Sequence, residues 1–245
     1  MNKREFRQLI CSMLLGDGHL TEEKYIMNHS NAQKDYASWK AELINSIFRE
    51  KNLDRRCTFG KTEKYDPIYD KTYYGVRVQL SWTKYFRLLK PRCYRIIGGK
   101  PIKNVEYLLR NINSDLHISI WLCDDGSEKR HKNPRGTRHI RKYINPFYEI
   151  CCYSFTEGQC QLAKQYFENK YQVQPRIVYD ACRGKNGYKL RFTCPDSQKL
   201  FQHIRPYLEQ VPSMKQKFWL SFERYLPNNE ENPNLGDDIV QTTTQ

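Results

Sequence analysis

Two aspartates, each followed by a glycine, stand about a hundred residues apart at the ends of similar apolar runs. Asp17 lies at the end of the run 9–18 (LICSMLLGDG), and Asp125 lies at the end of the run 118–126 (ISIWLCDDG). Runs that are apolar almost all round are typical of buried helices. A carboxylate at the C-terminal end of a helix faces the negative end of the helix dipole, which is unfavourable unless a cation lies nearby. The two sites therefore indicate chemistry that uses a divalent metal ion.

Both runs also contain small residues that would let the two helices pack closely together. These are Cys11, Ser12 and Gly16 in the first run and Ser119 and Cys123 in the second. Close packing across a pseudo-two-fold axis would bring Asp17 and Asp125 to the same end of the helix pair. Two acids there would hold metal ions between the attacking water and the leaving oxygen of a phosphodiester. Gly18 and Gly126 are expected to end their helices in the left-handed conformation.

The chain repeats one pattern of elements in its two halves. In the first half the helical run is followed by a strand at 25–30, a helix at 35–48, and a strand at 76–81 with a helix after it. The second half repeats this order with a strand at 148–154, a helix at 157–171, and a strand at 188–193 with a helix after it. Alternating strands with basic residues at every other position favour sheets with one buried and one wet face. We predict an α+β protein with two halves, 1–105 and 106–226, and a disordered acidic tail, 227–245.

The composition favours a partner that is a polyanion. The 245 residues carry a formal net charge of +14, and such an excess speeds the encounter with nucleic acid. The nine cysteines include no C-x-x-C pair, which argues against a structural zinc site, and we expect them to be reduced. The mean hydropathy is −0.84, and the sequence has neither a membrane-length apolar run nor a signal peptide. We expect an intracellular protein, in an organelle or in a microbial cytoplasm.

The motifs resemble the LAGLIDADG signature of homing endonucleases. The segment 121–127 (WLCDDGS) is similar to the Trp-x-x-Asp-Asp-Gly-Ser variant of one branch of that family. The segments 15–20 (LGDGHL), 36–40 (YASWK) and 205–214 (RPYLEQVPSM) are similar to the same branch. The resemblance covers about residues 5–222. It implies an αββαββα fold in each half, a saddle of antiparallel sheets in the DNA major groove, and signature helices at the interface between the halves.

The resemblance also implies a set of site residues. Asp17 and Asp125 would ligate Mg²⁺ or Mn²⁺, and the preceding residues, Gly16 and Asp124, would each offer a backbone carbonyl. Asp124 departs from the small residue that the family places there, so its side chain can compete as a ligand. A basic residue late in each half would lie near the scissile phosphate. The expected lysines are Lys217 in preference to Lys215 in the second half, and Lys100 in preference to Lys103 in the first.

Base recognition is expected from outward-facing side chains of the strands. The outward positions are Arg77 and Gln79 in the first half and Lys189 and Arg191 in the second. Further candidates are Lys61 and Lys64 in an expected hairpin of the first half and Arg176, Arg183 and Lys185 in the matching region of the second. A basic insertion at 128–142 adds candidate phosphate contacts at Lys129, Arg130, Arg135 and Arg138. Two different halves imply an asymmetric site of about 20 base pairs, or two DNA turns.

We therefore predict a monomeric, metal-dependent endonuclease that makes a staggered double-strand break in double-stranded DNA. The Met1 start favours an intron-encoded or free-standing frame. Two alternatives remain open from the sequence. An RNA maturase that assists intron splicing would keep the fold and bind intron RNA, and a catalytically silent DNA-binding protein would keep the strands without the metal site. The presence of both acids favours the nuclease.

Overall fold

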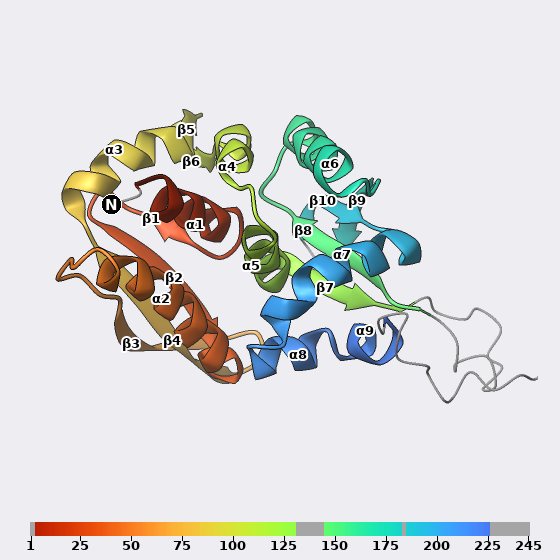
Figure 1. Ribbon diagram of the computed structural model, residues 1–245, viewed down its shortest axis with the longest axis horizontal. Helices are drawn as coiled ribbons and strands as arrows, with labels where there is room; N and C mark the ends of the chain where they lie inside the picture. Colours follow the sequence, from red (N-terminus) through yellow and green to blue (C-terminus); the bar gives the residue numbers. More distant parts are fainter. Residues whose placement is uncertain (1–2, 131–144, 183–184, 226–245) are drawn as a thin grey trace, which may run out of the picture.

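The computed structural model of the chain describes residues 3–130, 145–182 and 185–225, and these form two halves with one order of elements (Figure 1). The first half runs through α1 (Lys3–Leu15), β1 (His19–Leu20), β2 (Lys24–Ser30), η1 (Asn31–Gln33), α2 (Lys34–Arg49), β3 (Thr58–Asp66), β4 (Lys71–Ser81) and α3 (Thr83–Cys93). The second runs through α5 (Asp115–Asp125), β7 (Gly126–Lys129), β8 (Phe147–Cys152), α6 (Glu157–Tyr171), β9 (Arg176–Cys182), β10 (Lys185–Arg191) and α7 (Cys194–Leu208). Each half is thus αββαββα, as predicted.

Each half contains one four-stranded antiparallel sheet. The strand order is β1-β2-β4-β3 in the first half and β7-β8-β10-β9 in the second, so strands at corresponding places in the sequence also hold corresponding places in the sheets. The register agrees as well. Val78 pairs with Met27 in the first sheet, and Leu190 pairs with Ile150 at the same point of the second. The internal repeat seen in the sequence is therefore a structural repeat, and the mixed α+β class is confirmed.

Strand side chains alternate between a helix-covered face and an open face of each sheet. In β4 the buried apolar side chains are Val76, Val78 and Leu80, and they alternate with more exposed residues such as Arg77. In β10 Leu190 is buried in the same way. Because neighbours in a pleated strand point to opposite sides, one face of each sheet packs on helices and the other remains available to a ligand.

The two halves meet along α1 and α5, which lie side by side at the centre of the molecule (Figure 1). The helix α4 (Val105–Asn111) packs against α1 and also contacts α6 of the second half. One continuous core runs through both halves and includes Leu14 of α1 and Leu122 of α5, both with no exposed surface. The ends of the two signature helices are therefore fixed with respect to each other by shared burial.

The halves differ in the segment that follows their last common helix. The first half continues into a hairpin of β5 (Tyr94–Ile97) and β6 (Lys100–Lys103), whereas the second continues into two short helices, α8 (Pro212–Lys217) and α9 (Trp219–Arg224). Each segment places a lysine at the end of a signature helix, α1 in the first half and α5 in the second. No helix in the described ranges is long and apolar enough to span a membrane. The predicted tail, 227–245, lies outside the described residues.

Candidate metal centre and nucleic-acid interface

The ends of the two signature helices touch at Gly16 and Asp124. A Cβ atom added to Gly16 would lie 2.4 Å from the Cβ atom of Asp124. The backbone N–H of Asp17 donates a hydrogen bond of 3.2 Å to Oδ2 of Asp124. The expectation that Gly16 permits close approach of the helices is confirmed, because no larger side chain fits at that position.

The glycines after the two acids leave no room for a side chain, and their backbone is not left-handed. Among the described residues, the glycines with positive φ are Gly98 and Gly99, and Gly126 has a φ of −78°. The predicted left-handed conformation of Gly18 and Gly126 was therefore wrong. A Cβ at Gly18 would lie 2.5 Å from the carbonyl oxygen of Met13, and one at Gly126 would lie 2.3 Å from that of Leu122.

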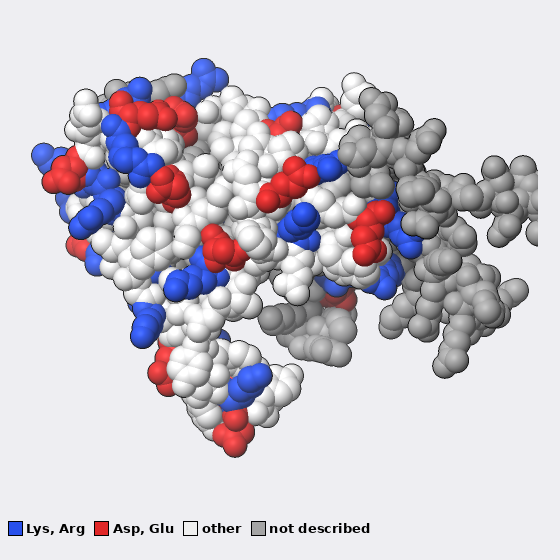
Figure 2. Space-filling view, turned by 60° about the horizontal axis from the view of Figure 1, so that its bottom comes forward, with Lys and Arg blue, Asp and Glu red and all other residues white. Residues whose placement is uncertain are grey.

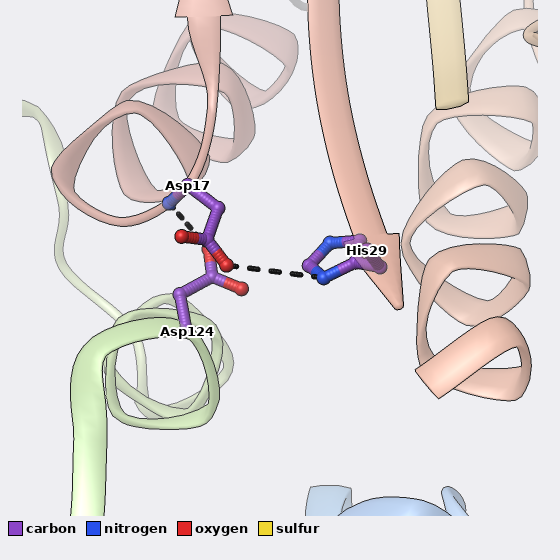
Figure 3. Close-up of side chains that lie close together, drawn as sticks. All are labelled: Asp17, His29 and Asp124. Atoms are coloured by element: carbon purple, nitrogen blue, oxygen red, sulfur yellow. Dashed lines mark hydrogen bonds and ion pairs between the residues drawn. The ribbon is translucent and has the colours of Figure 1, made fainter. Parts of the chain in front are cut away.

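Asp17, Asp124 and His29 form a cluster of the kind that holds metal ions. One potential ligand atom from each lies within 4.8 Å of the others, and Figure 3 shows the three side chains facing one another. His29 comes from β2, and its Nδ1 lies 3.8 Å from Oδ2 of Asp17. Burial, and then the positive charge of Lys40, lowers the pKa of His29 to about 4. At neutral pH the imidazole is thus uncharged and keeps a lone pair for a hydrogen bond or a cation.

The acid of the second motif, Asp125, lies close to the other two carboxylates. Burial, and then the charges of Asp124 and Asp17, raises the pKa of Asp125 to about 7. The pKa of Asp17 is also raised, first by partial burial and then by Asp124. The neighbouring carboxylates therefore raise the free energy of the charged forms of Asp17 and Asp125, and a cation among them would lower it.

Each signature helix ends against a lysine. Nζ of Lys217 lies 2.6 Å from the carbonyl oxygen of Cys123 and 3.5 Å from that of Asp124. In the first half, Nζ of Lys103 lies 2.6 Å from the carbonyl oxygen of Gly16. Lys100, the lysine preferred from the sequence, is exposed at the start of β6, so the structure places the alternative, Lys103, at the helix end instead.

A third lysine, Lys40 of α2, also lies at the ends of the signature helices. Its Nζ lies 2.7 Å from Oδ1 of Asp124, and neither side chain has any exposed surface. The Lys40 ammonium also lies 4.5 Å from the ring centroid of Tyr36, whose hydroxyl donates to the carbonyl oxygen of Ile120. Lys40 was not among the predicted site residues. The available signal was its position on the buried stripe of α2, which otherwise holds Tyr36, Ala37, Ala41, Ile44, Ile47 and Phe48.

The donor atoms at the two helix ends suit a hard divalent cation. They are the carboxylate oxygens of Asp17 and Asp125 and the carbonyl oxygens of Gly16 and Asp124, and Mg²⁺ and Mn²⁺ favour oxygen ligands. Lysine ammonium groups already lie against the two carbonyls, so both oxygens face positive charge. The oxygens of the Asp124 carboxylate, by contrast, already have partners in Lys40 and the Asp17 amide. The residues present therefore fit a metal centre.

The open face of the first sheet carries most of the predicted DNA-reading side chains of that half. Arg77 and Gln79 lie on it, and Nε of Arg77 donates to Oδ1 of Asn28 on the adjacent strand. Lys64 lies on the same face by its register. Lys61 pairs with Val76 and so points to the helix-covered side, where it lines a groove of about 900 Å³ with Lys34 and Tyr74. Its position contradicts a role for Lys61 on the open face.

The open face of the second sheet places Lys189 and Arg191 where the first sheet has Arg77 and Gln79. Both of these basic side chains form ion pairs with acidic residues. Nε of Arg191 lies 2.6 Å from Oε1 of Glu149, and Lys189 forms ion pairs with Glu149 and Asp180. Arg176 lies beside Arg191 in the register, and Lys129 extends the open face through β7. The two open faces therefore occupy equivalent places but differ in chemistry.

Of the remaining predicted DNA contacts, the structure describes the side chain of Arg130. The Arg130 guanidinium lies 4.9 Å from the ring centroid of Trp219. Arg135, Arg138 and Arg183 lie outside the described residues, as does the side chain of Lys185. Figure 2 shows one side of the molecule, on which Lys and Arg are spread with Asp and Glu between them.

Sequence comparison matches most of the chain to one family. The model of the LAGLIDADG DNA endonuclease family matches residues 7–201, which confirms the resemblance seen in the motifs. Two curated relatives, both called protein RecA, come from Mycolicibacterium flavescens and Mycolicibacterium chitae, with 25% identity over 218 residues and 24% over 217. Each match covers 86% of this chain and 45% of the relative. The chain thus spans about half the length of the curated relatives it matches.

Structural comparison supports the same fold. The homing endonuclease I-WcaI, solved bound to its DNA recognition sequence, has a TM-score of 0.60 to this chain and 15% sequence identity. The match covers 88% of this chain and 86% of that one. At this identity the likeness shows the saddle-type fold of two related halves.

Proposed function

Because the chain belongs to the LAGLIDADG DNA endonuclease family, we propose that it is a homing endonuclease that cuts both strands of a long, asymmetric DNA site. The reaction is a metal-dependent hydrolysis of one phosphodiester bond in each strand. The observation that carries the proposal is the meeting of the two motif ends. Asp17 and Asp125 come from different halves, yet the residues before them, Gly16 and Asp124, touch, and the Asp17 amide donates to the Asp124 carboxylate.

The two acids would hold the metal ions, Mg²⁺ or Mn²⁺, together with the carbonyl oxygens of Gly16 and Asp124. A bound divalent cation would activate water for attack and neutralise charge on the phosphate oxygens. The carboxylates and carbonyls of this chain would supply the ligand atoms, and the Asp17 side chain, which is 43% exposed, leaves the centre open to a phosphate group. Asp124 would contribute its carbonyl, while its carboxylate keeps its contacts with Lys40 and the Asp17 amide.

Lys103 and Lys217 would act on the phosphates. Each ends beside one signature helix, Lys103 against Gly16 and Lys217 against Cys123 and Asp124. An ammonium group within reach of the reacting phosphate stabilises the negative charge that develops on the leaving oxygen. We accordingly assign the lysine of the first half as Lys103, and not Lys100.

The open faces of the two sheets would read the DNA. Arg77, Gln79 and Lys64 contact bases in one half-site, and Lys189, Arg191 and Arg176 contact bases in the other. Because these side chains differ between the halves, the two half-sites differ in sequence. Both motifs lie in one chain, so we propose that a monomer completes the site. The boundary between the halves lies near residue 105, where α4 begins.

Cleavage of a randomised duplex DNA library in Mg²⁺ tests the proposal. The wild-type protein, Asp17→Asn and Asp125→Asn are compared, and the cut ends are sequenced. The expected result is a staggered cut at one asymmetric site of about 20 base pairs. Each variant should bind the same site and either fail to cut it or cut a single strand.

Lys61→Ala provides a matched control, since Lys61 lies on the helix-covered side of its sheet. Its cutting rate should stay near that of the wild type. Binding of duplex DNA by the wild type without any cutting, in either Mg²⁺ or Mn²⁺, would contradict the nuclease proposal. Intron RNA would then be the substrate to assay, through its splicing rate.

A further inference from the structure

The two catalytic acids are held in their places by different means. Asp125 is the last residue of α5, and the N–H of Gly126 continues the helical pattern by donating to Leu122. The helix α1 ends at Leu15, two residues before Asp17. The N–H of Gly18 returns to the carbonyl oxygen of Met13, and the N–H of Asp17 donates to the Asp124 carboxylate in the other half. At Asp17, a side-chain oxygen of Asp124 thus takes the place of the backbone carbonyl that would accept this hydrogen bond in a continuing helix.

Lys40 in turn fixes the Asp124 carboxylate. Oδ1 of Asp124 accepts from Nζ of Lys40 at 2.7 Å, which leaves Oδ2 facing the Asp17 amide. Neither side chain of the ion pair is exposed. A buried pair in this geometry is rigid, because a rotation of either group would leave a buried charge without its partner. The chain of contacts runs from Lys40 through Asp124 to the backbone of Asp17.

Within the described residues, the second half has no counterpart to this chain of contacts. Lys40 is the seventh residue of α2, counted from Lys34, and the seventh residue of α6, counted from Glu157, is Ala163. Ala163 is fully buried and carries no charge. The residue that corresponds to Asp124 in the first motif is Gly16, which has no side chain. The ion pair therefore serves one acid only.

We propose that Lys40 and Asp124 are a positioning pair that fixes Asp17, so that the two cleavage sites depend on different supports. The inference rests on the proposed nuclease function. Neither residue needs to touch DNA or the attacking water. Loss of the pair should disturb the site that uses Asp17 and leave the site that uses Asp125 largely intact. The pair also joins the two halves, because Lys40 and Asp17 come from the first half and Asp124 from the second.

The test removes the pair as a unit, since removing one partner would leave a buried charge and could unfold the chain. Lys40→Met/Asp124→Leu replaces both charges with apolar groups and removes the acceptor for the Asp17 amide. Lys40→Met/Asp124→Asn also removes both charges but keeps an oxygen that can accept from that amide. Glu106→Gln/Arg110→Met removes an exposed ion pair and serves as the control for charge loss elsewhere.

Two readouts are measured on these variants. The first is hydrogen exchange at the amides of Asp17 and Asp125 in the protein without DNA or metal. In Lys40→Met/Asp124→Leu (the Leu variant) the Asp17 amide should exchange at least about tenfold faster than in Lys40→Met/Asp124→Asn (the Asn variant). The exchange rate of the Asp125 amide should be unchanged in both. The second is single-turnover cleavage of the target with a different label on each strand. In the Leu variant, one strand should be cut at least about fivefold more slowly relative to the other than in the wild type or the control.

The outcomes separate this inference from the function on which it rests. Unchanged exchange at Asp17 in the Leu variant would overturn the inference, and so would slowing of both strands by one common factor. If the wild type cuts no DNA, the nuclease function fails, and the exchange rates alone decide whether the pair positions Asp17.

Discussion

The Nζ atom of Lys103 lies 2.6 Å from the carbonyl oxygen of Gly16, the residue before Asp17. In the second half, Nζ of Lys217 lies 2.6 Å from the carbonyl oxygen of Cys123 and 3.5 Å from that of Asp124, the residue before Asp125. The two lysines come from unlike segments, a β-hairpin and a short helix, yet they converge on the two signature helices. This arrangement agrees with the role at the phosphates that we propose for both lysines.

Replacement of Lys103 by methionine should slow DNA cutting by about 10²–10³-fold, because a charge-stabilising group at a reacting phosphate typically contributes that much. Lys100→Met removes the same charge from an exposed position three residues earlier and should leave the rate within about twofold of the wild type. Single-turnover cleavage at saturating protein provides the measurement. Equal losses in the two variants would show that only the overall charge matters.

The repeat was predictable because its signals are local. The apolar runs that end at Asp17 and Asp125, and the alternation in strands such as 76–81, depend only on side chains close together in sequence. The class of the fold and the two acids could be read from these patterns without any knowledge of long-range contacts.

Pairings between residues far apart in the sequence could not be read in the same way. Lys40 meets Asp124 across 84 residues, and Lys103 meets Gly16 across 87. No local pattern distinguishes Lys103 from Lys100, since the choice depends on how the hairpin β5–β6 folds back onto α1. The side of the sheet to which Lys61 points also required the register with β4, because a shift of one residue reverses it.

Gly126 should tolerate no side chain. Its φ of −78° is accessible to alanine, so backbone strain is not the reason. A Cβ would lie 2.3 Å from the Leu122 carbonyl oxygen, which is part of the helix and cannot move freely. Gly126→Ala should lower the free energy of unfolding by about 1–3 kcal/mol, as overpacking generally does.

Gly158 is the matched control for that substitution. It lies in the first turn of α6, and a Cβ added there would meet no atom within 4 Å. Gly158→Ala should be neutral or slightly stabilising, because alanine loses less conformational entropy in a helix. Urea unfolding of the two variants and the wild type measures the difference, and a similar loss in both variants would contradict the steric explanation.

His117 should make the stability of the protein depend on pH. Its Nδ1 accepts hydrogen bonds from the backbone N–H groups of Asn113 and Ser114 at the start of α5. Burial, and then the charge of Lys170, lowers the pKa of His117 to about 4, below its ordinary value of 6.5. Between these two values the unfolded chain binds more protons than the folded one. The stabilisation is therefore complete above pH 6.5 and is lost as the pH falls towards 4, by up to about 1.4 kcal/mol per pH unit.

His117→Gln keeps an acceptor at this capping position but cannot be protonated. The variant should lose less stability than the wild type between pH 6.5 and 4, and the two should show a constant difference above pH 7. Unfolding by urea at several pH values gives both curves. Parallel curves across the whole range would mean that His117 does not titrate in this window.

Arg191 and Lys129 should affect DNA binding in different ways, although both lie on the open face of the second sheet. Arg191 is held by Glu149 at 2.6 Å, and a guanidinium fixed in this way can present its remaining N–H groups to one base. Arg191→Ala should relax the preference at a single base position, with a change of about 1–3 kcal/mol. Lys129 is exposed at the end of β7, so Lys129→Ala should weaken binding to all sequences alike and reduce the slope of affinity against salt by about one.

Binding to a panel of single-base variants of the target at several salt concentrations distinguishes the two effects. If Arg191→Ala lowered affinity uniformly, Arg191 would be a phosphate contact, and recognition in that half-site would fall to its neighbours Lys189 and Arg176.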